Sequence, residues 1–209
     1  MTEQELKKRY KRIKKELDKL FPHVTTALKY KTPFQLLIAT IMSAQCTDTL
    51  VNKVTGPLFK KYRTPKDFAK ANLATLTKDI YPVTFYRQKA KSIKKTAQII
   101  DKQYGGKVPK NIDELVELPG VARKTANVVL GHAYNIQSGF VVDTHVKRVA
   151  KRLGLTKNTD PKKIEKDMMK IVPKKDWTKF ADQLIWYGRK YCTARTDKCE
   201  LNGIKLTHY

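Results

Sequence analysis

The order of apolar and polar residues along the chain is typical of a helical protein. Near the N-terminus, apolar side chains recur at steps of three and four, at Leu6, Tyr10, Ile13, Leu17 and Leu20. That spacing places them on one face of a helix covering residues 2 to 21, whose outer face is rich in lysine. Thr2 and Glu5 fit a capping box at its start.

A second segment is apolar on nearly every side. It runs from Phe34 to Met42, behind Thr32-Pro33, where proline takes its favoured first helical position. A helix without a polar face is expected inside the protein, so this segment is predicted to be a buried central helix. We expect Phe34, Met42 and also Trp186 to belong to the core.

Further helix boundaries are predicted from capping residues, prolines and glycines. The stripe from Tyr86 to Ile100 predicts a helix that ends at Gly105-Gly106. Other helix starts are expected at Thr47 or Asp48, Thr64-Pro65, Asn111, Ala122, Asp143, Asp160-Pro161 and Asp176. No long alternating strand pattern and no repeat at a solenoid period interrupts them. The predicted class is all-α.

The charge of the chain points to a polyanionic partner. Its 209 residues contain 44 Lys and Arg against 19 Asp and Glu, a formal charge of +25. Nucleic acid is the first candidate and an anionic membrane the rival. No apolar run reaches the ~18 residues of a span and no signal-peptide core follows the start, so we expect a soluble intracellular protein. Three cysteines form no dense disulfide framework, which suits a reducing compartment.

The candidate chemistry lies between two predicted helices. Ile112–Leu118 ends at Pro119-Gly120, and the chain restarts as Ala122–Leu130, which predicts a helix, a tight hairpin and a helix. Glycine lets the backbone approach a phosphate, while the amides and dipole of the second helix favour the negative charge. For Pro-Gly alone, an ordinary helical hairpin without a ligand is the commoner interpretation.

The residues around this hairpin resemble the endonuclease III family of base-excision DNA glycosylases. The motifs that match, in the expected order, are Leu37–Asp48, Phe85–Lys91, Leu118–Leu130, Val141–Val149 and Tyr187–Cys192. The resemblance extends from about residue 30 to residue 200. It implies an enzyme that removes a damaged base. It also favours a hairpin that binds phosphate over an ordinary helical hairpin without a ligand.

Lys124 falls on the nucleophile of the family. The resemblance implies that its uncharged amine attacks the sugar, expels the base and leaves a Schiff base, whose β-elimination nicks the strand. Positive surroundings and partial burial both favour an uncharged amine. Relatives that remove a base without cutting carry another residue type here, so a bifunctional glycosylase and lyase is expected. For an arbitrary lysine, a solvated or phosphate-contacting side chain is the simpler interpretation.

Asp143 falls on the essential carboxylate of the family. The implied role is to stabilise the positive charge that grows on the sugar and to assist proton transfers around the nucleophile. An aspartate before Thr144 is equally a good helix N-cap, and both roles are compatible. We expect His145 to orient local hydrogen bonds, and we expect no catalytic role for it.

The resemblance also implies a set of DNA contacts. Gln45 matches the side chain that fills the space left when the damaged nucleotide is flipped out. The hairpin residues expected to bind DNA are Leu118, Pro119, Gly120, Val121, Ala122 and Arg123. Ala122 stands where the family hairpin usually has a second glycine, and we expect this methyl group to reduce the approach of the backbone modestly.

The C-terminal region departs from the family. Relatives carry four cysteines spaced C-x6-C-x2-C-x5-C that hold a [4Fe-4S] cluster, whereas this chain keeps Cys192 and Cys199 and has Asn202 and His208 at the other two places. Two thiolates cannot hold an ordinary four-cysteine cluster. We expect the cluster to be lost, no cofactor, and a loop held by packing or by a Cys192–Cys199 contact. The alternatives are a metal site of Cys192, Cys199 and His208, or a degenerate iron-sulfur site.

The expected architecture is two helical domains flanking a cleft, with a six-helix domain at 25–136 that carries the hairpin and a second domain from 1–24 plus 137–209. The expected function is excision of oxidised pyrimidines followed by strand cleavage. The alternatives are another lesion, an oxidised purine or a mismatch, and a non-catalytic helix-hairpin-helix DNA-binding protein. The expected partner is double-stranded DNA with a damaged base or abasic site, bound by a monomer. The protein is expected inside the cell with the DNA, which means the cytoplasm or nucleoid if the host is a prokaryote.

Overall fold

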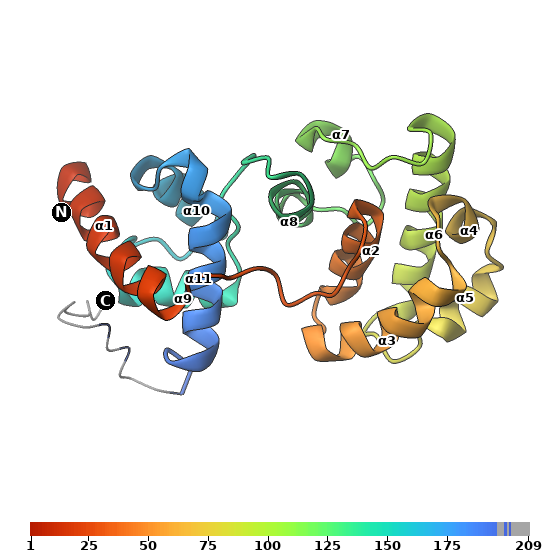
Figure 1. Ribbon diagram of the computed structural model, residues 1–209, viewed down its shortest axis with the longest axis horizontal. Coiled ribbons are helices and arrows are strands. Elements are labelled where there is room, and N and C mark those ends of the chain that lie inside the picture. Colours follow the sequence, from red (N-terminus) through yellow and green to blue (C-terminus); the bar gives the residue numbers. More distant parts are fainter. Residues whose placement is uncertain (196–198, 200, 202–209) are drawn as a thin grey trace. The chain divides into compact units, whose positions relative to one another are not determined.

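The computed structural model describes residues 1–195, 199 and 201, and every regular element among them is a helix (Figure 1). The chain packs as two compact units. Thr26–Ile136 forms one of them, called the hairpin unit below; Met1–Thr25 together with Gln137–Tyr209 forms the other, called the terminal unit. The predicted all-α class is confirmed.

The hairpin unit is built around one buried helix. Its helices are α2 (Pro33–Ser43), α3 (Asp48–Lys61), α4 (Pro65–Lys70), α5 (Leu73–Asp79), α6 (Tyr86–Gln103), α7 (Ile112–Val116) and α8 (Arg123–Tyr134). Every residue from Phe34 to Met42 is buried, as the apolar sequence of α2 predicts. This helix contacts α3, α6 and α8 and so forms the centre of the core.

The hairpin unit contains seven α-helices where the sequence predicts six. The additional helix is α5, which buries only Leu76. Its single local signal is Asn72, whose side chain accepts a hydrogen bond from the backbone N–H of Thr75. A helix of two turns that buries one residue shows no apolar periodicity, which is why the pattern does not reveal it.

The terminal unit combines the first helix of the chain with its last helices. Its helices are α1 (Glu3–Leu20), α9 (Thr144–Arg152), α10 (Pro161–Ile171) and α11 (Trp177–Lys190), with a short 3-10 helix at Lys174–Asp176. The capping box of Thr2 and Glu5 is present. Tyr10 of α1 donates a hydrogen bond to Asp176 over 2.9 Å and packs edge-on against Phe180 of α11.

Most of the predicted caps are found. Thr32, Thr47, Thr64, Asn111, Asp143 and Asp160 each accept a hydrogen bond from the first turn of the helix that follows. The prediction that Trp186 belongs to the core is wrong. This residue is only half-buried, and its indole N–H donates to the carbonyl of Thr25 over 3.0 Å. Trp and Tyr often pack one side of the ring while the polar end meets a partner outside the core.

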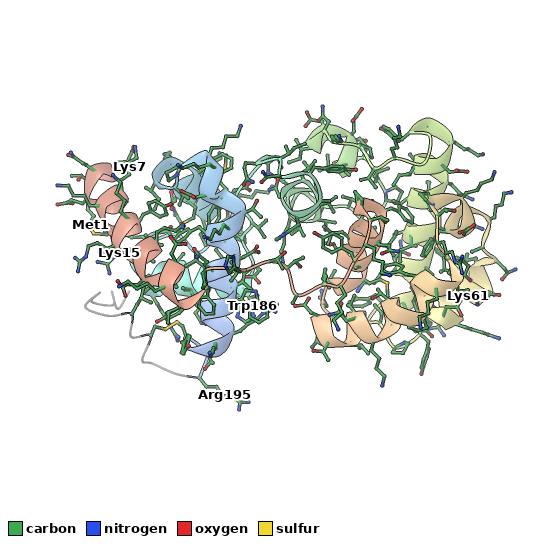
Figure 2. All side chains as sticks on the ribbon, in the orientation of Figure 1. Met1, Lys7, Lys15, Lys61, Trp186 and Arg195 are labelled. Carbon is green, nitrogen blue, oxygen red and sulfur yellow. A yellow bond between two sulfur atoms is a disulfide. The ribbon has the colours of Figure 1, made fainter. Side chains whose placement is uncertain are left out.

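Basic side chains project from both units, for example Lys7 and Lys15 from α1 and Lys61 from α3 (Figure 2). Lys7 and Lys61 form ion pairs with Glu3 and Asp79, but the 44 basic residues of the chain far outnumber its 19 acidic residues. Among the described residues, no helix is long and apolar enough to cross a bilayer.

Candidate functional site

The predicted hairpin is present between α7 and α8. Two backbone hydrogen bonds form its turns, from Leu118 N to Leu115 O over 3.2 Å and from Val121 N to Leu118 O over 3.0 Å. Leu118 and Val121 are buried in the core of the hairpin unit, so they anchor the turn and do not offer their side chains to a ligand. If these two residues contact DNA, as expected, they do so through their backbone groups and not through their side chains.

Gly120 occupies a position that other residues cannot take without strain. Its φ of +81° is left-handed, and a Cβ at this point would lie 3.0 Å from the Cβ of Ser92. Pro119 is held from the same side, because the buried hydroxyl of Thr96 donates to its carbonyl over 2.9 Å. Ser92 and Thr96 belong to α6, so this long helix fixes the hairpin, while the backbone of Gly120 stays exposed.

Helix α8 begins without a side-chain cap. Ala122 is the N-cap residue, and its extended backbone (φ −82°, ψ 164°) is ordinary for a residue with a Cβ. The alanine that replaces the second glycine of the family is therefore accommodated without strain. Because the methyl group of Ala122 cannot accept from the N–H groups of the first turn, a phosphate oxygen can take the place of a capping side chain, and the helix dipole favours it.

Lys124 is the second residue of α8, and its side chain is exposed, as is that of Arg123. Both side chains are therefore accessible at the surface of the hairpin unit. The structure does bring Lys124 within one helical turn of Gly120 and Ala122. An amine thus lies beside the place where the hairpin can hold a phosphate.

Asp143 caps α9 in the terminal unit. Its Oδ1 accepts a hydrogen bond from Val146 N over 2.7 Å, and its side chain is partly buried. The capping interpretation is thereby confirmed. Lys124 belongs to the hairpin unit and Asp143 to the terminal unit.

Gln45 lies directly after α2, at the C-terminal end of the buried helix. Its side chain is exposed and its φ of +53° is left-handed, which is uncommon for a residue other than glycine. Non-glycine residues in this conformation are enriched at active sites, ligand clamps and switch regions.

Phe85 is a candidate that the sequence pattern did not single out. It is the N-cap residue of α6, has φ +56° and is 62% exposed, although it is a large apolar side chain. An exposed phenylalanine on a strained backbone costs stability and is suited to stacking on another surface. The motif Phe85–Lys91 marked the region, but only the backbone angle and exposure identify the residue.

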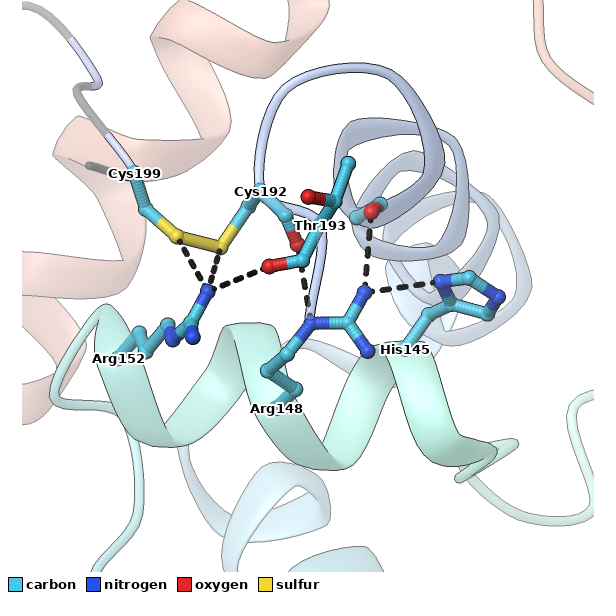
Figure 3. The surroundings of a disulfide bond; sticks show 7 residues. His145, Arg148, Arg152, Cys192, Thr193 and Cys199 are labelled. Atoms are coloured by element: carbon cyan, nitrogen blue, oxygen red, sulfur yellow. Dashed lines mark hydrogen bonds between the residues drawn. A yellow bond between two sulfur atoms is a disulfide. The ribbon is translucent and has the colours of Figure 1, made fainter. Parts of the chain in front are cut away.

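The region of the cysteines forms a compact corner in the terminal unit, called the C-terminal corner below (Figure 3). Cys192 and Cys199 form a disulfide and both are buried. Arg152 of α9 donates to Thr193 O over 2.8 Å and to the two sulfur atoms over 3.3 and 3.5 Å. Arg148, one turn earlier, donates to Cys192 O over 2.9 Å and to Gly188 O over 3.0 Å.

His145 completes the corner. Its Nδ1 lies 3.1 Å from Nη2 of Arg148 (Figure 3). Because a guanidinium can only donate, Nδ1 accepts and this nitrogen carries no proton. Burial lowers the pKa of His145, and Arg148 and Arg189 act in the same direction, while Asp143 opposes them. Burial and the charge of Arg152 also lower the pKa of Arg148.

No group of three or more metal-binding side chains occurs within the part of the chain that the structure describes. Cys46, the remaining cysteine, lies in the other unit. Asn202 and His208, which take the third and fourth family positions, lie outside the described residues. With its two sulfurs bonded to each other, the Cys192–Cys199 pair offers no thiolate and does not fit a four-cysteine cluster.

Comparison with known proteins places the hairpin and both units in one family. Residues 38–174 match the model of the HhH-GPD superfamily of base excision DNA repair proteins. The chain is 50% identical to endonuclease III of Synechocystis sp. over 88% of this chain and 84% of the relative. It is 47% identical to endonuclease III of Bacillus subtilis over 90% and 88%, respectively.

Comparison with solved structures leads to the same family. A non-covalent complex of endonuclease III with DNA is 44% identical, with a TM-score of 0.87 over 95% of this chain and 91% of that chain. A trapped covalent intermediate of endonuclease III with DNA is 43% identical, with a TM-score of 0.88 over 98% and 94%. The chain therefore belongs to the HhH-GPD superfamily and, within it, to the endonuclease III family of DNA glycosylases and AP lyases.

Proposed function

We propose that this protein excises oxidised pyrimidines, such as thymine glycol, from double-stranded DNA and then cuts the strand on the 3′ side of the lesion. The observation that carries the proposal is Lys124, an exposed amine in the first turn of the uncapped helix α8, next to the hairpin. A trapped covalent enzyme-DNA intermediate is among the similar solved structures, and a covalent step is what an amine at this place supplies.

In the proposed reaction the nitrogen of Lys124 attacks C1′ of the damaged nucleotide. The bond between C1′ and the base breaks, and the base takes the proton that the nitrogen loses. The nitrogen then forms a double bond to C1′ as the C1′–O4′ bond breaks and O4′ takes up a proton. The resulting Schiff base withdraws electrons from C2′, so that a proton is lost there and the 3′ phosphate departs. Hydrolysis of the remaining imine releases Lys124 for another cycle.

Asp143 is proposed to act in the same reaction. Its carboxylate stabilises the positive charge that develops on the sugar as the base leaves, and it accepts and returns protons around the amine. Oδ1 is engaged by Val146 N, which orients the carboxyl group at the start of α9. A cap and a reacting group are therefore combined in one side chain.

DNA binding is assigned to the hairpin. The N–H groups at the start of α8 and the exposed backbone of Gly120 would hold phosphate oxygens, with Arg123 and neighbouring lysines adding charge. Each phosphate neutralised should lower the logarithm of affinity by about 0.9 per logarithmic unit of salt. A response to salt that is nearly flat would contradict this binding mode.

Gln45 and Phe85 are proposed to fill the gap that the flipped nucleotide leaves. An amide can hydrogen-bond the orphaned base, and an aromatic ring can stack on its neighbours. Both residues are exposed and both have left-handed backbones in the hairpin unit.

We further propose that the enzyme works without an iron-sulfur cluster, since the chain has only three cysteines and two of them are joined. Metal analysis and absorbance at about 400 nm of the purified protein test this proposal. A stoichiometric metal would overturn it.

Because the proposed substrate is chromosomal DNA, we place the protein inside the cell with the DNA, where it acts as a monomer.

The deciding experiment is a lesion-panel cleavage assay with borohydride trapping. Wild-type protein should cut a thymine glycol duplex and an abasic duplex, and borohydride should trap it on both. Lys124→Gln should give neither nick nor adduct, whereas Lys102→Gln, which removes an exposed lysine of α6, should behave as wild type.

The same panel separates the other lesions. Preferential cutting at an oxidised purine or a mismatch would replace the proposed substrate but keep the chemistry. Binding without cutting any substrate, abasic sites included, would reject catalysis altogether.

A further inference from the structure

One lysine of the hairpin unit is buried. Lys89, in the first turn of α6, is 7% exposed, and its ammonium group donates to Met42 O over 2.7 Å and to Ala44 O over 2.6 Å. Within residues 1–195, 199 and 201, no carboxylate forms an ion pair with it. Its charge is therefore compensated by main-chain oxygens of another helix.

These oxygens belong to the end of α2. The last carbonyls of a helix lack partners within the helix and carry partial negative charge, so a cation beside them is favourable. The last turn of α2 contains no basic residue of its own, and Lys89 supplies the cation from α6. Burial lowers the pKa of Lys89, which shows that removing this amine from water has a cost that the two hydrogen bonds must offset.

The position of Lys89 joins two exposed turns. Gln45 directly follows the carbonyl of Ala44 and has φ +53°. The backbone N–H of Lys89 bonds to the carbonyl of Phe85 over 3.0 Å, and Phe85 has φ +56°. A single residue thus contacts the turn that presents Gln45 through its side chain and the turn that presents Phe85 through its backbone.

We propose that Lys89 is a positioning residue that fastens the Gln45 turn to the start of α6, so that Gln45 and Phe85 are held in register for insertion into the DNA duplex. The proposal rests on the role given above to these two side chains. Lys89 itself contacts neither DNA nor the reacting sugar. Its contribution is to keep a left-handed turn, which is unfavourable by itself, in one conformation before DNA arrives.

The test compares two substrates that differ in their need for insertion. Lys89→Met has a side chain of similar length without the donor. We expect it to excise thymine glycol from a duplex about tenfold more slowly than wild type. Cutting of a single-stranded abasic oligonucleotide should be unchanged, because that substrate has no partner base and no gap to fill.

Borohydride trapping on the single-stranded oligonucleotide counts the active molecules, so that incomplete folding of a variant does not enter the comparison. Lys89→Gln, which keeps a shorter polar group, is the second variant and should show the same selective loss. The matched control is Lys94→Met. Lys94 lies on the same helix and also donates to a helix-end carbonyl, that of Ala71, yet it does not contact the Gln45 turn. Its removal should affect both substrates equally.

A double-mutant cycle adds a readout that a general loss of stability would not change. If Lys89 acts through Gln45, the pair Lys89→Met and Gln45→Ala should excise no more slowly than the slower single variant. The proposal is overturned if the two losses multiply, or if Lys89→Met excises from the duplex at the wild-type rate per trapped molecule. Failure of the proposed function is a separate outcome, because wild-type protein itself would then form no adduct.

Discussion

The hairpin and the C-terminal corner both hold a chain turn against a helix, but they do so with different groups. The hairpin uses its own backbone, a left-handed Gly120, two buried apolar residues and a single hydroxyl of α6, that of Thr96, and it leaves the start of α8 open. The corner uses a disulfide and the side chains of Arg148 and Arg152, which are directed at main-chain oxygens and sulfur.

The difference follows from what each turn must leave available. A surface that receives phosphate needs N–H groups without partners, so side chains are kept away from it. The corner has no such need, and its carbonyl groups are bonded by arginines of α9. Because Asp143 caps the same helix, the corner supports the helix that presents the proposed carboxylate.

The largest effect is expected at Asp143. Asp143→Asn keeps the cap, since asparagine caps as well as aspartate, but removes the charge. We expect base release to fall by at least about 100-fold, with little change in the free energy of unfolding. Asp160→Asn is the matched control, because Asp160 caps α10 in the same unit and has no proposed role in the reaction. Excision assays with urea unfolding measure both, and near-normal excision by Asp143→Asn would exclude its assignment.

The second-largest effect is expected at the disulfide of the C-terminal corner. Changing Cys192 and Cys199 together to serine should lower the free energy of unfolding by about 2 kcal/mol, because a short loop is no longer closed in the unfolded chain. Cys46→Ser should not, since Cys46 is a free thiol of the other unit. Thermal unfolding with and without a reductant measures the same contribution in the wild-type protein. Identical midpoints would show that the disulfide does not stabilise the corner.

A smaller effect is expected on the hairpin side. Gly120→Ala forces a Cβ onto a left-handed backbone and against Ser92 at 3.0 Å, at a cost of about 1–2 kcal/mol, and it should weaken DNA binding. Gly56→Ala is the control with the opposite sign, because Gly56 lies in α3 with nothing near its missing Cβ and alanine favours a helix. Unfolding and binding titrations test this pair. Equal stabilities would mean that the hairpin can shift to accept the methyl group.

The features predicted from the sequence are those that local chemistry determines. Caps such as Thr47 and Asp160, the buried helix α2 and the hairpin each follow from a few neighbouring residues. The short helix α5 was missed because it buries a single side chain. The prediction that Trp186 belongs to the core was wrong. Its indole N–H bonds to the carbonyl of Thr25, which lies far away in the sequence, and local sequence does not reveal such a partner.

The roles that the sequence could not indicate depend on contacts between distant segments. Arg148 and Arg152 look like ordinary members of a basic helix face until their partners at Cys192 and Thr193 are known. Lys89 is one of many lysines, and only its burial and its two carbonyl partners distinguish it. In a chain with 44 basic residues, composition hides the few that are structural.

The smallest expected effect is a pH dependence confined to the corner. His145 accepts from Arg148 only when its Nδ1 is unprotonated, and burial lowers its pKa in the folded protein below the ordinary 6.5. The unfolded chain therefore binds a proton at this residue more readily than the folded one. The stabilisation is complete above about pH 6.5 and is lost as the pH falls below it.

Urea unfolding at about pH 8 and pH 5.5 should show this loss, and His145→Gln should reduce the difference, while a change of the exposed His23 should not. The effect stays small because His145 is only partly buried and solvent screens its charge. If His145→Gln leaves the pH dependence unchanged, the histidine does not hold Arg148 in place. The corner would then depend on the disulfide and on the bonds from the two arginines to main-chain oxygens alone.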